Sequence, residues 1–258
     1  MGSIHDYDDV PQLSAGALSA LQEFLGERDA RTKQFEDLKV AAEEDFTKTE
    51  QPLSMEAFTE DWNASQFWAR RTVSPRGQAG GYNDETATTL ARQLLDNATD
   101  DTKIAVVSAP SVFIQLKNLL RSGEYKIRPE VTLLEFDERF GVFKEWVPYD
   151  FMFPTRLPPN LKGQFDRIIC DPPFLSVDCQ TKAALTVRWL AKSVDPSAQR
   201  LIICTGERME SMIVKLYGKT SVRTTDFEIQ HAKCLSNEFR CYANYEARDV
   251  WRWNEACE

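Results

Sequence analysis

An apolar run at residues 168–170 is followed directly by Asp171, Pro172, Pro173 and Phe174. Proline has no backbone N–H and a fixed φ, so this turn leaves its carbonyl oxygens free to accept hydrogen bonds. An amine that attacks a methyl group needs acceptors for its N–H bonds, so that its lone pair is directed at the methyl carbon. The Asp171 carboxylate and the Pro172 carbonyl are such acceptors, and Phe174 can cover a planar base or an alkyl-ammonium group. The turn therefore predicts a site for a methyl-accepting amine, and the alternative is a rigid strand-to-helix turn.

Acidic residues follow another strand-like run, residues 131–135. In nucleotide-binding α/β folds, an acidic side chain at the end of the second strand accepts hydrogen bonds from ribose hydroxyls. Glu135 and Asp137 are both candidates, although only one is needed. Asp150, in the loop that follows, is a candidate acceptor for an adenine amino group. The alternative for each acid is a solvated loop charge.

A tight turn of Ser108, Ala109 and Pro110 follows the apolar run 104–108 and leads into a predicted helix at 111–121. The N-terminus of a helix presents backbone N–H groups and favours a negatively charged ligand. The turn could therefore meet the amino-acid part of a cofactor, although it is not the usual glycine-rich fingerprint. Together with the acidic candidates, it predicts S-adenosylmethionine (SAM) as the methyl donor.

The elements that must position these residues alternate between strands and helices, as a parallel α/β sheet requires. Asn83 or Asp84 can cap a first helix, whose apolar residues recur on one face up to Leu95. Two later aromatic-rich runs are separated only by a loop, which indicates an antiparallel pair at the sheet edge. The predicted fold is α/β and Rossmann-like, mostly parallel with an antiparallel edge pair. The strands are expected at 104–108, 131–135, 165–170, 200–204, 224–230 and 239–245, and further helices at 111–121, 181–191 and 209–216.

Charge divides the chain into two predicted parts. Residues 1–60 contain 14 acidic and 5 basic residues, so they carry the whole net charge of −9, and residues 61–258 are neutral. We expect residues 1–60 to form a helical acidic extension, with a helix capped by Ser14 and then a linker, and residues 61–258 to form the catalytic domain. The N-terminus is acidic, unlike a secretory signal, and no long apolar run is present. We therefore expect a cytoplasmic protein that does not contact membranes. We also expect it to act as a monomer.

Six cysteines are present, without a C-x-x-C pair, and several lie in apolar, strand-like runs. Buried reduced thiols are the ordinary interpretation of that pattern. The two histidines, His5 and His231, have no metal-type spacing to a cysteine, so no metal site is expected.

With these residues in hand, the chain resembles the class I SAM-dependent methyltransferases that carry a D/N-P-P-Y/F motif. It is most similar to the elongation factor 1-alpha lysine methyltransferases, a family earlier labelled as N6-adenine DNA methyltransferases. The segments that carry the resemblance extend over almost the whole chain: 11–15, 20–24, 66–68, 84–87, 107–112, 135–137, 149–150, 171–174, 204–206 and 237–242.

The resemblance implies a role for each candidate. Ser108, Ala109, Pro110, Glu135 and Asp150 would bind SAM, while Asp171, Pro172, Pro173 and Phe174 would hold the substrate lysine. Gln66, Phe67, Trp68 and the turn from Asp84 to Thr86 would close over the methionine end of SAM. The chain departs from the family pattern by an insertion at 69–81, and Phe174 replaces a frequent tyrosine.

Two alternatives remain at this point. A nucleic-acid amine methyltransferase would have to flip a base into the pocket and hold phosphates with basic residues. Only Arg70, Arg71 and Arg76 cluster locally, and an acidic extension would repel DNA while steering a basic protein. A non-catalytic SAM-binding scaffold is the other alternative, against which the candidates at every cofactor position argue. The expected partner is therefore a protein, elongation factor 1-alpha, with no stable nucleic-acid complex.

Overall fold

The computed structural model describes residues 81–231 and 238–254. Their centre is a seven-stranded sheet with the order β3-β2-β1-β4-β5-β7-β6. The strands are β1 (Lys103–Val107), β2 (Glu130–Glu135), β3 (Trp146–Pro148), β4 (Arg167–Cys170), β5 (Arg200–Gly206), β6 (Arg223–Glu228) and β7 (Phe239–Ala243).

Strands β1 to β5 run parallel to one another, and β7 is antiparallel to both of its neighbours, β5 and β6. The predicted fold class, with its antiparallel edge pair, is therefore confirmed. The sequence did not predict β3, because it is only three residues long and its residues are not fully buried. It extends the sheet beyond β2, and Glu135 pairs with Pro148 there.

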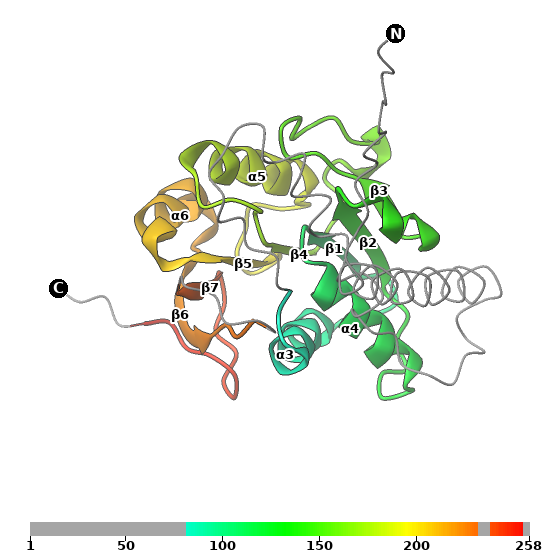
Figure 1. Cartoon of the computed structure of the whole chain (residues 1–258). Coiled ribbons are helices and arrows are strands. Elements are labelled where there is room, and N and C mark those ends of the chain that lie inside the picture. The colour runs from blue at the N-terminus through cyan, green and yellow to red at the C-terminus, as the bar shows by residue number, and fades with distance from the viewer. Residues whose placement is uncertain (1–80, 232–237, 255–258) are drawn as a thin grey trace, which may run out of the picture.

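Helices cover both faces of the sheet: α3 (Asp84–Leu95) and α4 (Pro110–Arg121) lie on one face, and α5 (Val177–Leu190) and α6 (Glu210–Tyr217) on the other (Figure 1). A hydrophobic core lies on each face of the sheet. One strand contributes side chains to both cores because successive side chains point to opposite faces. Ile104 and Val106 belong to the core under α3 and α4, while Ala105 and Val107 belong to the core under α5. Short 3₁₀ helices lie at Glu138–Val142, Pro159–Leu161, Glu207–Met209 and Gly218–Thr220.

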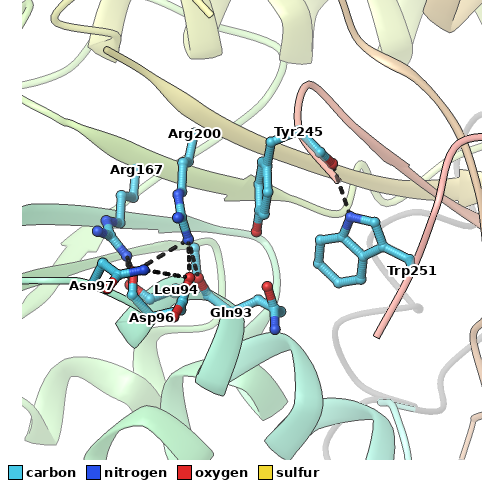
Figure 2. Close-up of polar contacts among 8 residues, drawn as sticks. All are labelled: Gln93, Leu94, Asp96, Asn97, Arg167, Arg200, Tyr245 and Trp251. Carbon is cyan, nitrogen blue, oxygen red and sulfur yellow. Dashed lines mark hydrogen bonds and ion pairs between the residues drawn. The ribbon is translucent and has the colours of Figure 1, made fainter. Parts of the chain in front are cut away.

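Helix α3 is fixed at both ends. Asn83 is its N-cap, with the side-chain oxygen accepting from the Thr86 N–H, which decides between the two predicted caps. At the other end, the guanidinium groups of Arg167 and Arg200 reach the last carbonyls of the helix (Figure 2). Arg167 donates to the carbonyls of Leu94 at 2.9 Å and Asp96 at 2.6 Å. Cations at a helix C-terminus are favourable because orphan carbonyls concentrate negative charge there.

The other predicted elements are present with shifted ends. Helix α5 begins at Val177, earlier than predicted, because Ser176 caps it with a hydrogen bond from the Cys179 N–H. Cys170, Cys179, Cys204 and Cys241 are buried free thiols, as expected. The helix capped by Ser14, the linker and the basic loop before Gly81 lie outside the described residues.

Candidate active site

The carboxyl ends of the parallel strands bring the predicted site residues to one edge of the sheet. Val107 pairs with Leu134 on one side and with Cys170 on the other. The ladder continues one residue further, since the Ser108 N–H donates to the Leu134 carbonyl at 2.9 Å and the Asp171 N–H to the Val107 carbonyl at 3.0 Å. Ser108, Glu135 and Asp171 therefore lie at the ends of three adjacent strands, where open α/β sheets bind ligands.

Ser108 starts the turn from β1 into α4 with a left-handed backbone, φ 53°. Such a conformation is uncommon outside glycine and is typical of turns at functional sites. Ala109 is the N-cap of α4 and supplies no side-chain hydrogen bond, Pro110 is in the first turn, and that turn has no acidic residue. The positive end of α4 is thus not neutralised by a side chain of its own first turn, which suits a ligand carboxylate.

Glu135 ends β2 with a partly buried carboxylate. Its Oε1 accepts the N–H groups of Phe136 at 2.8 Å and Asp137 at 3.3 Å, which leaves Oε2 without a hydrogen bond within the described part of the chain. Burial raises the pKa of Glu135 to about 7, although the two N–H bonds oppose that shift. Asp137 has a different environment, because both of its oxygens accept from the Arg139 guanidinium. Glu135 is therefore better placed than Asp137 to accept ribose hydroxyls.

Asp150 lies beside Glu135. The Tyr149 N–H donates to the Glu135 carbonyl at 3.1 Å, which places the start of the loop after β3 against the end of β2. Asp150 Oδ1 accepts the N–H of Met152 at 2.8 Å, so the loop turns at this residue. The loop then reaches the predicted substrate pocket, where the ring centroids of Phe151 and Phe174 are 5.5 Å apart.

Asp171 is partly buried, and its carboxylate accepts a 2.6 Å hydrogen bond from the Tyr82 hydroxyl. Burial is the main reason why its pKa rises to about 7; the Tyr82 hydrogen bond opposes the rise and the charge of Glu135 adds to it. The sequence did not single out Tyr82, which is separated from Asp171 by 89 positions. An aromatic hydroxyl directly before a capped helix was the available signal.

The turn after Asp171 is held by a side chain that the sequence also did not single out. Pro172 is buried and Pro173 is exposed. Buried Gln180, on α5, donates to the Phe174 carbonyl at 3.0 Å and to the Thr205 hydroxyl at 2.9 Å. This amide therefore ties the turn to the end of β5.

Gly206, at the end of β5, leaves room for the side chain of Leu175. A Cβ at Gly206 would lie 2.8 Å from a methyl carbon of Leu175, the residue directly after Phe174. The turn that contains Asp171 to Phe174 therefore packs against the end of β5 through Leu175.

The predicted residues at the methionine end of SAM are only partly described. Thr86 lies in the first turn of α3, where its N–H donates to Asn83 and its hydroxyl accepts the Gln230 N–H at 3.2 Å. Trp68, Gln66 and Phe67 lie outside the described residues.

Two features of the described residues bear on other functions. Within 81–231 and 238–254, no three or more His, Cys, Asp or Glu side chains gather as metal ligands. In the same part of the chain, no helix is both long and apolar enough to cross a membrane.

Comparison with known proteins identifies the family. The family model described as "Probable N6-adenine methyltransferase" matches residues 60–247. The chain is 40% identical to the Saccharomyces cerevisiae protein "Protein-lysine N-methyltransferase EFM5", over 93% of this chain and 94% of that protein. It is 34% identical to human "EEF1A lysine methyltransferase 1", over 96% of this chain and 97% of the human one. The chain belongs to the EEF1A lysine methyltransferase 1 family.

As a member of this family, the chain is a protein-lysine N-methyltransferase whose methyl donor is SAM. The residues at the sheet edge fit that cofactor. The free Oε2 of Glu135 suits a ribose hydroxyl, and the first turn of α4, which has no acidic residue, suits the carboxylate of the methionine part. The predictions of family, enzyme class and cofactor are therefore confirmed, whereas the individual residue roles remain predictions.

Proposed function

We propose that the protein methylates a lysine side chain of translation elongation factor 1-alpha, at the carboxyl edge of the sheet beside Asp171. The observation that carries this proposal is the identity of 34–40% with proteins named as lysine methyltransferases, some of them for EEF1A, over more than nine-tenths of the chain. The acceptor site supports it, because Asp171 and the carbonyls that follow can accept N–H bonds from an amine.

In this proposal, Glu135 and Asp150 bind the ribose and the adenine amino group, and the Ser108–Pro110 turn meets the methionine carboxylate. SAM supplies an electrophilic methyl group when it is bound. Asp171 and the Pro172 carbonyl orient the lysine nitrogen, and Phe174, with Phe151 beside it, lines the alkyl part of the side chain. Trp68 and Thr86 belong to the methionine end of the same site.

Lysine must lose a proton before it can attack, since its free pKa is about 10.4. Removing the ammonium group from water into an aromatic pocket favours the neutral amine. Asp171 then orients the amine, and water carries the proton away. The enzyme works as a cytoplasmic monomer on a protein substrate, and its acidic residues 1–60 attract the basic surface of that partner.

The test is methylation of purified elongation factor 1-alpha with radiolabelled SAM, followed by mass spectrometry to locate the modified residue. In a parallel assay with cell extract, the label is treated with protease or nuclease. We expect protease to release the label and mass spectrometry to find a methylated lysine. Label that survives protease and is lost to nuclease would instead support an N6-adenine-type enzyme, and SAM binding without any transfer would support a scaffold.

A further inference from the structure

Asp171 is held by a residue from a distant part of the chain. The Tyr82 hydroxyl donates to Asp171 Oδ2, and Tyr82 is only 5% exposed. Asp171 Oδ1 receives no hydrogen bond from the residues that the structure describes. One carboxylate oxygen is therefore occupied, and the other is available to a substrate N–H.

Tyr82 is itself fixed, so its hydroxyl is not free to turn away. Its backbone forms an antiparallel bridge with His231, and the two rings are 5.3 Å apart. The ring of His231 in turn packs edge-on against Phe239, at 4.5 Å. Next to Tyr82, the Asn83 N–H donates to the Gln230 carbonyl at 3.0 Å. The segment after β6 therefore holds Tyr82 in place at the start of α3.

We propose that Tyr82 is a positioning residue for methyl transfer, whose hydroxyl keeps Asp171 ionised and in one orientation to accept the lysine N–H. This inference rests on the proposed function, because it assumes that Asp171 contacts the substrate amine. A neutral Asp171 would carry its own proton and could no longer use both oxygens as acceptors.

The surroundings of Asp171 explain why such a donor matters. Burial and the negative charge of Glu135 both raise the pKa of Asp171, and the Tyr82 hydrogen bond lowers it. Burial raises the pKa of the neighbouring thiols and lowers that of His231 to about 4, so these groups are uncharged near pH 7. Tyr82 is thus the group among them that stabilises the ionised carboxylate. The titratable groups around the pair are Glu135, Cys170, Cys179, Cys204 and His231.

The first test is Tyr82→Phe, which removes the hydroxyl and keeps the ring. We expect kcat near pH 7 to fall about fivefold, because a rise of about one pKa unit in Asp171 lowers its ionised fraction at that pH by about this factor. Because Asp171 still ionises at higher pH, the ratio of wild-type to variant kcat should shrink toward pH 9. SAM affinity should stay within about twofold. An equal loss at every pH would show a merely structural role and overturn the proposal.

The second test needs no protein substrate. A ¹³C NMR titration of aspartate carboxyl carbons, with the Asp171 signal assigned through Asp171→Asn, measures its pKa directly. We expect a higher pKa in Tyr82→Phe and a lower one when residue 82 is 3,5-difluorotyrosine, a stronger donor that retains the ring and hydroxyl. An unchanged Asp171 pKa in the fluorinated protein would overturn the proposal even if Tyr82→Phe were poorly folded.

The matched control is Tyr245→Phe. The Tyr245 hydroxyl is buried without a partner among the described residues, and its ring lies against Arg200 at the opposite edge of the sheet (Figure 2). Its loss should change neither the Asp171 pKa nor kcat. If wild-type protein binds SAM, shows the Tyr82-dependent NMR shift and yet methylates no elongation factor, the proposed substrate fails while the Tyr82–Asp171 link stands.

Discussion

In the proposed mechanism Asp171 accepts an N–H bond from the substrate amine and must be ionised, in a position where burial opposes ionisation. Burial raises its pKa to about 7, so this carboxyl titrates near neutral pH. A residue of this kind fits a functional site, because structural carboxylates are more often paired with cations that lower their pKa.

Replacing Asp171 tests the acceptor role. In Asp171→Asn the amide can still accept the Tyr82 bond, but its NH₂ group repels the N–H of a substrate amine. We expect kcat above pH 7 to fall about 100-fold, typical of losing one electrostatic contact in a transition state, with SAM affinity nearly unchanged. Rates measured from pH 6 to 9 check this. Because wild-type Asp171 ionises through pH 7, the ratio of wild-type to variant rates should rise with pH, and full activity of Asp171→Asn at every pH would contradict the role.

The partly buried Glu135 carboxyl should make the free energy of unfolding depend on pH. Its pKa is raised from 4.5 to about 7. The folded state therefore binds this proton more tightly than the unfolded state does. The resulting contribution to the free energy of unfolding is present at low pH and is lost as the pH rises through 7. Glu135→Gln resembles the protonated form. We expect its free energy of unfolding without SAM to match that of the wild type at pH 4 and to exceed it at pH 8, by on the order of 1–3 kcal/mol. Urea titrations at both pH values measure this.

The same variant should bind SAM about tenfold more weakly, because an amide is a poorer acceptor for ribose hydroxyls than a carboxylate. Isothermal titration calorimetry measures the affinity. Glu138→Gln, an exposed residue in the 3₁₀ helix that follows, is the control and should leave stability and affinity unchanged. A Glu135→Gln protein that is less stable than wild type at pH 8 would show that the carboxylate is needed for folding.

At the scale of elements, the sequence predicted the central strands because continuous apolar runs mark buried parallel strands, and the residues after them share one edge. That argument located Ser108, Glu135 and Asp171 together. It did not locate Tyr82 or Gln180, because their partners are set by how α3 and α5 pack on the sheet, and periodicity does not specify which polar side chains meet across elements. The three-residue strand β3 was missed for a related reason, since its pairing with β2 makes it a strand.

Helix α3 runs from the Asp171 end of β4, near its start, to the Arg167 end, where Arg167 binds its last carbonyls. Loss of that contact should destabilise the fold. Arg167→Met removes the donor to two carbonyls in a place where Arg167 is 8% exposed. We expect a loss of about 2–4 kcal/mol in the free energy of unfolding, because hydrogen bonds to a charged group are strong and the buried Leu94 carbonyl loses this donor, whereas the Asp96 carbonyl keeps its bond from Arg200. Denaturant unfolding checks it.

The control for Arg167 is Arg92→Ala on the same helix. Arg92 forms an exposed ion pair with Glu124, 50% and 42% exposed, and pairs of this kind contribute at most about 1 kcal/mol. Similar losses in the two variants would show that the helix end is not specially anchored by Arg167.

At the scale of the whole molecule, large apolar side chains are exposed to solvent beside the proposed catalytic edge, the carboxyl ends of the parallel strands. Phe153 is 55% exposed and Val177 is 67% exposed, and they follow Phe151 and Phe174, whose rings are in contact. Lys182 on α5 also approaches the sulfur of Met152 at 3.5 Å, so the loop after β3 and the start of α5 form one continuous surface. We therefore expect a protein substrate that delivers a lysine to Asp171 to cover this surface.

Phe153→Ser tests that contact. Covering a Phe side chain stabilises a complex by about 1–2 kcal/mol, so we expect KM for the protein substrate to rise about five- to thirtyfold, with SAM affinity and kcat at saturating substrate unchanged. Steady-state kinetics with elongation factor 1-alpha separates these parameters. The matched control is Val194→Ser, which is 71% exposed in the loop between α5 and β5, away from the catalytic edge. Because removing any exposed apolar group makes the surface more polar, an equal rise in KM in both variants would contradict a specific contact. A rise confined to Phe153→Ser would place the substrate over the loop that also carries Asp150.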